Sequence, residues 1–119
     1  MVPRSAPRSS APGVTPRKQR KLTKAIKIAP EDPDVYLSFA LTYDAMEEFH
    51  PSVYYFRKAL ELNPEDPYIW TQLGITLARM GMHDESIRSY HEALELDPGY
   101  VIAKWHMALT YRSVGLYED

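Results

Sequence analysis

Apolar residues recur along this chain at spacings of three and four, in pairs of stripes separated by short polar breaks. One stripe runs from Val35 to Tyr43 and a second from Val53 to Leu62, with a break at 47–51 between them. Matching stripes run from Ile69 to Leu77 and from Ile87 to Leu94. Such spacing is typical of helices with one buried face. The pattern therefore predicts an all-α protein in which residues 35–62 form one pair of helices and residues 69–94 form another.

The two segments are copies of one unit. Residues 31–64 align with residues 65–98 without a gap, and eleven of the 34 positions are identical. The same phase continues upstream, where AIKIAPEDP at 25–33 repeats ALELNPEDP at 59–67, and downstream into residues 101–119. A period of this length indicates stacked helix pairs, each of which buries its apolar face against its neighbours.

Residues that start and stop helices agree with this division. Asp32-Pro33 and Asp66-Pro67 each place a capping carboxylate before a proline suited to the first helical position. Gly81 lies in the break of the second unit, whereas Glu47 occupies the matching position of the first. Because glycine is the residue that most readily ends a helix with a left-handed turn, we expect the turn at Glu47 to be irregular.

The repeat boundaries and the helix-capping residues divide the chain into five parts. Residues 1–15 form a disordered basic arm rich in Pro, Ser and Arg, and residues 16–30 form the lone second helix of a truncated repeat. Residues 31–66 and 67–100 are complete repeats. Residues 101–119 hold the first helix of a truncated third repeat.

This constellation resembles the tetratricopeptide repeat (TPR) family over about residues 20–119. The resemblance implies a right-handed superhelical array of antiparallel helix pairs. In the third unit Lys104 stands where the family has an aromatic residue, and Trp105 is beside it. Small residues such as Ala59 and Ala93 would let helix axes approach closely. The residues that the resemblance assigns to the repeated core are Tyr36, Phe39, Ala40, Tyr43, Phe56, Ala59, Pro64, Trp70, Leu73, Gly74, Leu77, Tyr90, Ala93 and Pro98.

The resemblance also implies a role in protein binding, because the first helices of this family line a concave groove. Residues expected to face it are Leu37, Ser38, Leu41, Tyr68, Thr71, Gln72, Ile75, Arg79, Ile102, Trp105, His106, Leu109 and Arg112. A known subclass clamps chaperone carboxylates with Lys, Asn and Arg, but none of these stands at the clamp positions Leu37, Leu41, Gln72, Ile102 and His106. An apolar peptide or amphipathic helix is the expected ligand, with Trp105 and Tyr68 as anchors.

Charge is divided unevenly between the arm and the rest of the chain. Residues 1–24 hold seven basic residues and no acidic ones, while the remainder holds seven basic and all sixteen acidic residues. The basic cluster Arg17–Lys21 could act in nuclear import, as an adaptor for nucleic acid or a membrane surface, or as part of a transit peptide, or it could be a solvated tail. The excess of acidic residues after residue 24 argues against a large contact with nucleic acid, because such a contact needs a basic face. We expect a cytoplasmic protein.

Catalytic and metal-binding patterns are missing from the sequence. It has no cysteine, its four histidines have no zinc-site spacing, and its five glycines form no phosphate loop. We therefore expect no metal, no cofactor and no enzyme activity, although the chain could be a targeting or regulatory part of a larger enzyme. No apolar run approaches the roughly 20 residues that cross a bilayer.

The predicted helix Val101–Val114 is apolar on nearly all sides. A helix of this kind is normally covered on more than one face. Self-association through it is therefore a further expectation.

Overall fold

The computed structural model describes residues 31–115. The expectations for the basic arm, for the lone helix of residues 16–30, for the cluster Arg17–Lys21 and for residues 116–119 lie outside this range. The described helices are α2 (Pro33–Ala45), α3 (Phe49–Leu62), α4 (Pro67–Arg79), α5 (His83–Leu96) and α6 (Val101–Ser113). The described residues contain no strand, in agreement with the predicted all-α class.

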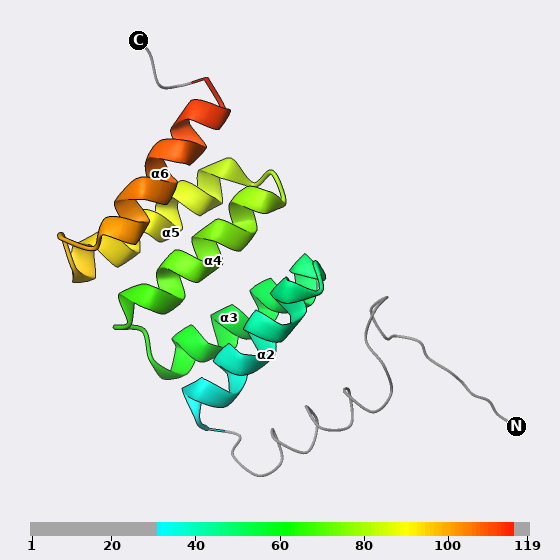
Figure 1. Ribbon diagram of the computed structural model, residues 1–119. Helices are drawn as coiled ribbons and strands as arrows, with labels where there is room; N and C mark the ends of the chain where they lie inside the picture. Colours follow the sequence, from blue (N-terminus) through cyan, green and yellow to red (C-terminus); the bar gives the residue numbers. More distant parts are fainter. Residues whose placement is uncertain (1–30, 116–119) are drawn as a thin grey trace, which may run out of the picture.

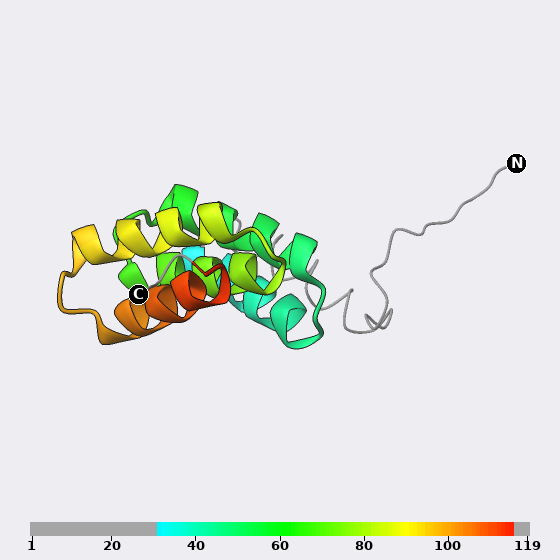
Figure 2. The same ribbon diagram turned by 90° about the horizontal axis from the view of Figure 1, so that it is seen from above.

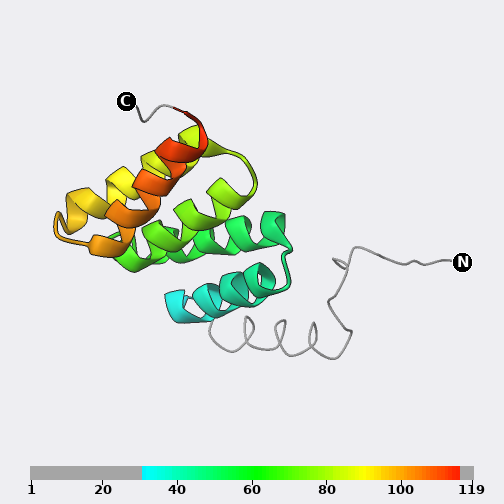
Figure 3. The ribbon, with the colours of Figure 1, turned by 45° about the horizontal axis from the view of Figure 1, so that its top comes forward.

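The helices form antiparallel pairs that stack side by side. Helix α2 pairs with α3 and α4 pairs with α5, while α6 packs on α5 and α4 (Figure 1). Seen from above, α3 and α5 make one layer, and α2, α4 and α6 make the other (Figure 2). The oblique view shows the same succession of pairs along the array (Figure 3). The layer of α2, α4 and α6 is the one that the repeat phase assigns to the groove.

Both complete units begin with the same cap. Asp32 and Asp66 have extended backbones, and each carboxylate accepts a hydrogen bond from the backbone N–H two residues on, at 2.9 Å. Pro33 and Pro67 follow at the first helical position. The aspartate satisfies one of the N–H groups that a helix start leaves unpaired, and proline at the first helical position has no N–H to satisfy.

The turns after the first helices are also equivalent, which corrects the expectation of an irregular turn at Glu47. Glu47 has a φ of 62°, and Gly81 and Gly115 have φ of 84° and 75° at the positions 34 and 68 residues later. All three directly follow the residue that ends a helix, where the left-handed conformation closes the last turn. Packing of the two helices therefore imposes the same turn on a residue that disfavours it.

A continuous apolar core joins the two units, in which Phe56 and Ala59 of the first unit pack with Leu73 of the second. Phe56, Ala59 and Tyr90 are fully buried, as is Ala93. Each pair is also tied by a buried hydrogen bond. Ser52 Oγ donates to the Ala40 carbonyl at 2.8 Å, and Ser86 Oγ donates to the Gly74 carbonyl at 2.7 Å in the next unit.

Gly74 allows α4 and α5 to come close together. A Cβ atom on this residue would lie 2.6 Å from Cε1 of Tyr90, which is shorter than a carbon–carbon contact allows. In the first unit the matching pair is Ala40 and Phe56, both fully buried. The two units thus make the same close contact between helices with different pairs of side chains.

Four residues assigned to the repeated core are less buried than that assignment implies. Pro64 and Pro98 are exposed, because they lie in the connections after α3 and α5 and not between helices. Tyr36 is half-buried and stacks on Tyr55, with ring centroids 6.2 Å apart. Trp70 is half-buried as well.

Helix α6 keeps the register of α4. Its buried residues are Ala103 and Thr110, which lie 34 positions after the buried Ile69 and Thr76. Lys104 and Ala108 are exposed. Their counterparts in α4 are Trp70 and Gly74, which meet α5, whereas α6 has no such partner helix within residues 31–115. The helix expected at Val101–Val114 ends at Ser113.

Candidate functional site

The residues expected in the groove all lie on α2, α4 and α6 and differ in exposure. The most accessible apolar ones are Trp105 at 63%, Ile102 at 48%, Leu109 at 39% and Tyr68 at 37% exposed. Ser38, Arg79 and Arg112 are exposed, while Leu37, Leu41, Gln72, Ile75 and His106 are half-buried. Together they give this layer an apolar and aromatic surface with few charges.

Thr71 does not belong to this accessible surface. It is fully buried, and its Oγ1 makes no hydrogen bond within residues 31–115. Helix α4 is packed by α5 and also by α6, so a side chain on the inner edge of α4 is covered. The matching residue of α6 is Trp105, which is exposed because no later described helix packs on it.

A polar cluster joins α2 to α4. The Asp44 carboxylate accepts hydrogen bonds from Thr76 Oγ1 at 2.9 Å and from Arg79 Nη1 at 3.2 Å. The Arg79 guanidinium also lies over the Phe49 ring, 4.7 Å from its centroid. Arg79 is therefore held in place by partners on α2 and α3. The sequence phase placed Arg79 on this face but did not predict its contact with Asp44.

A pocket of about 330 Å³ opens between α4 and α6. It brings together four of the expected groove residues, namely Ile75, Arg79, His106 and Leu109. Helix α5 contributes His83 and Tyr90, and the remaining lining residues are Ala78, Thr110 and Ser113. These five residues were not among the groove residues expected from the sequence. Tyr90 was expected only in the core, and the phase of the first helices says nothing about residues of α5.

Two buried polar atoms of this pocket have no partner among the described residues. They are the phenol oxygen of Tyr90 and Nδ1 of His83. The nearby hydroxyls of Ser86 and Thr110 donate to backbone carbonyls, of Gly74 and His106 respectively. An unmade hydrogen bond at a buried atom costs about 1–3 kcal/mol. The lining of the pocket is therefore polar as well as apolar.

Burial favours the neutral forms of two groups that line the pocket, Tyr90 and His106. It raises the pKa of the Tyr90 phenol, an effect that the nearby hydroxyls of Ser86 and Thr110 partly oppose. Burial likewise lowers the pKa of His106, whose ring stacks on Tyr90 with centroids 6.4 Å apart. No carboxylate lines the pocket. Its charged group is the Arg79 guanidinium.

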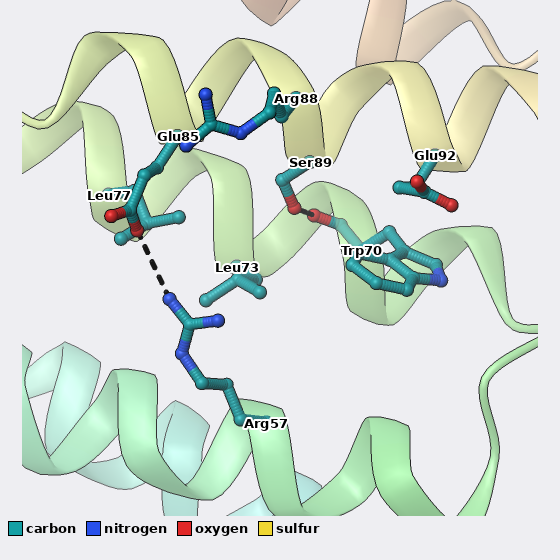
Figure 4. A pocket seen from close by; sticks show the side chains of 8 residues that line it. All are labelled: Arg57, Trp70, Leu73, Leu77, Glu85, Arg88, Ser89 and Glu92. Atoms are coloured by element: carbon teal, nitrogen blue, oxygen red, sulfur yellow. Dashed lines mark hydrogen bonds and ion pairs between the residues drawn. The ribbon is translucent and has the colours of Figure 1, made fainter.

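A second hollow, of about 400 Å³, lies between α3 and α5 with α4 behind it (Figure 4). Leu73 and Leu77 form its floor, and the Arg57–Glu85 ion pair spans it at 3.2 Å. The Trp70 ring is fixed at one end, because its Nε1 donates to the Pro64 carbonyl at 2.8 Å. This hollow belongs to the layer opposite the expected groove.

Other kinds of site are not evident in the described range. Among residues 31–115 no three His, Asp or Glu side chains are grouped so that they could hold a metal ion. None of the helices described is both long enough and apolar enough to span a membrane.

Comparisons with solved structures show the same architecture. A MamA structure matches with a TM-score of 0.77 and 23% identity, over 82% of this chain and 57% of that chain. MamA of MSR-1 matches with a TM-score of 0.72 and 29% identity, over 87% and 59%. A Thermobaculum terrenum O-GlcNAc transferase matches with a TM-score of 0.77 and 25% identity, over 85% of this chain and 19% of the transferase chain. The chain thus spans less than two thirds of each.

Family models give the most direct assignment. No curated protein matches the chain in sequence. Tetratricopeptide repeat models match residues 33–66 and residues 67–100, one complete helix pair each. The fold is the α–α superhelix of that family, and its repeats support a general role as a protein-interaction scaffold. The chain belongs to the tetratricopeptide repeat family.

Proposed function

We propose that this chain binds an apolar peptide or an amphipathic helix of a protein partner on the layer formed by α2, α4 and α6. The observation that carries the proposal is the row of exposed apolar side chains on α4 and α6. Tyr68, Ile102, Trp105 and Leu109 are each more than a third exposed. Contiguous apolar surface of this kind marks interaction sites in proteins.

The charges of this face support an apolar ligand over a strongly charged one. The Arg79 guanidinium is paired with Asp44, and burial favours the neutral form of His106. At the five positions of the chaperone clamp, Leu37, Leu41 and Ile102 are aliphatic. Binding of a C-terminal chaperone carboxylate by the usual clamp is therefore not part of the proposal.

The test is a comparison of partner binding by two double variants. Tyr68→Ala with Trp105→Ala removes the expected anchors on α4 and α6. Large aromatic anchors contribute about 2 kcal/mol or more each, so affinity for a bound partner should fall at least about tenfold. The matched control is Tyr54→Ala with Leu96→Ala, because these residues are 54% and 41% exposed on the opposite layer.

Partners retained by the wild type and by the control, but lost by the groove variant, are expected in a pull-down. Affinities for a segment of such a partner are then measured by isothermal titration calorimetry. Loss with the control and retention with the groove variant would place binding on the layer of α3 and α5 and contradict the proposal. If the occupant is a second copy of the chain, through the exposed face of α6, sedimentation will depend on concentration.

A second candidate is a targeting or regulatory array within a larger enzyme. The likeness to an O-GlcNAc transferase, of which the chain covers 19%, favours this candidate. Any reaction would then belong to residues outside this chain. The same groove would recruit the substrate protein, so the two double variants test this candidate too.

A further inference from the structure

The repeat shows which chemical group fits the pocket between α4 and α6. Between α2 and α4, the corresponding place is filled by the Asp44 side chain, which accepts hydrogen bonds from Thr76 and Arg79. Thirty-four residues later, Ala78 stands at the position of Asp44, and Thr110 at that of Thr76. Both Ala78 and Thr110 line the pocket. We call the contact of α2 with α4 the first junction and that of α4 with α6 the second junction. The second junction keeps the hydroxyl donor, Thr110, and lacks the carboxylate that this hydroxyl would bind.

The surroundings of this place also differ from those of the first junction. His83 and Tyr90 stand where the first unit has Phe49 and Phe56, so two apolar rings are replaced by rings with polar atoms. These polar atoms, His83 Nδ1 and the Tyr90 phenol oxygen, are buried without a partner among the described residues. Thr110 Oγ1 donates to the His106 carbonyl of its own helix at 3.0 Å, whereas Thr76 Oγ1 reaches across to Asp44.

We propose that this pocket receives an aspartate or glutamate side chain of the segment bound in the groove, held by the Thr110 hydroxyl as Thr76 holds Asp44. Ser113 adds a second hydroxyl. The Arg79 guanidinium also lines the pocket, but it is already paired with Asp44. No lining residue is acidic. A carboxylate moved out of water needs such hydrogen bonds to offset its desolvation.

The proposal rests on the proposed function only in that the carboxylate belongs to the bound segment. It differs from the chaperone clamp, because His106 is the one pocket residue that stands at a clamp position, and Ala78, Thr110 and Ser113 do not. It also refines the expected ligand. An apolar or amphipathic segment would carry one acidic residue on the side that faces α6.

The pocket can be tested with a small probe that needs no partner. Sodium propionate is titrated into the isotope-labelled full chain at constant ionic strength, with propylammonium chloride as the cationic comparison. Propionate is expected to shift the amide resonances of Ala78, Thr110 and Ser113 to saturation, and propylammonium is not. Equal shifts with both probes, or none with propionate, overturn the proposal.

Substitutions then test whether propionate binds at the position that corresponds to the Asp44 carboxylate in the first junction. Ala78→Asp supplies a carboxylate from the chain itself and should abolish the propionate response. Ala45→Asp is the control, because it adds the same charge on the exposed last residue of α2 and should leave the response unchanged. If Ala78→Asp responds to propionate like the wild type, the assignment is wrong.

A milder variant keeps the test decisive if Ala78→Asp does not fold. Thr110→Val preserves shape and removes the hydroxyl. It should weaken propionate binding about tenfold, as expected for one hydrogen bond to a charged group. Unchanged affinity in this variant also contradicts the proposal.

The experiments distinguish failure of the pocket proposal from failure of the groove proposal. Tyr68→Ala with Trp105→Ala should lose the protein partner and keep the propionate response. Ala78→Asp should lose the propionate response and weaken the partner. A partner that binds Ala78→Asp at full strength would overturn the pocket assignment and leave the groove proposal standing.

Discussion

At the scale of single residues, the left-handed turn at Glu47 is a point of strain that the sequence repeat exposes. Its φ of 62° matches a conformation that glycine adopts at Gly81 and Gly115. For a residue with a Cβ atom this conformation costs roughly 1 kcal/mol or more. We expect Glu47→Gly to raise the free energy of unfolding by up to about 1 kcal/mol, less the extra entropy that glycine gives the unfolded chain. Urea unfolding followed by circular dichroism measures this change.

The neighbouring Glu48→Gly is the matched control. It removes the same charge and adds the same freedom to the unfolded chain, but Glu48 has an ordinary φ of −95°. It should therefore leave stability unchanged or lower it. If both variants shift the free energy of unfolding equally, the effect comes from charge and not from the turn.

At the scale of helices, His106 of α6 stacks on Tyr90 of α5, and burial favours its neutral form. Burial lowers its pKa below the ordinary value of 6.5. In the unfolded chain the imidazole binds a proton at that ordinary value, while in the folded protein it does so only at lower pH. As pH falls from about 7.5 to about 5.5, the unfolded state gains protons first, and the free energy of unfolding decreases.

His106→Gln removes this contribution, so its stability should vary less with pH over that interval. Denaturant midpoints of wild type and variant at both ends of the interval measure the difference. His91→Gln, at an exposed position of α5, provides the comparison. A wild-type curve that is flat over this interval, or one that keeps its slope in His106→Gln, would count against the role of His106.

At the scale of the whole molecule, the 34-residue period predicted the helix order, the caps at Asp32 and Asp66 and the buried Ala59 and Ala93. These features depend on residues that the two units share, so one alignment reveals them. Tyr36 and Trp70 are shared as well, yet both lie at the edge of the core. Burial at an edge depends on which helix packs next, and a repeat pattern does not contain that information.

The pocket could not be predicted because it arises where the units differ. Asp44 and Ala78 occupy equivalent positions, and their difference matters only because Thr76 and Thr110 face them from the next first helix. Comparison of the two units could have revealed the missing carboxylate. That α5 completes the pocket with His83 and Tyr90 follows from three helices packed together, and no spacing within one helix encodes it.

The tyrosines make the whole fold sensitive to alkaline pH. Burial raises the pKa of Tyr43, Tyr55, Tyr90 and Tyr100 above the ordinary value of 10.0, and for Tyr55 the neighbouring tyrosines add to the effect. Tyr55 lies between Tyr36 and Tyr43, with ring centroids 6.2 and 5.8 Å away. Above about pH 10 the unfolded chain loses phenolic protons that the folded protein retains, so the free energy of unfolding falls as pH rises.

Tyr55→Phe should reduce that loss, because it removes one of the buried phenols and its repulsion with the others. The free energy of unfolding in urea is compared at about pH 9 and about pH 10.5, where the phenols begin to ionise. Tyr111→Phe on α6 serves as the control, since it deletes a phenol outside this stack. If Tyr55→Phe and Tyr111→Phe lose stability to the same extent as the wild type, the stacked tyrosines do not set the alkaline limit. The limit would then lie with tyrosines outside the stack, such as Tyr90 and Tyr100, or with net charge.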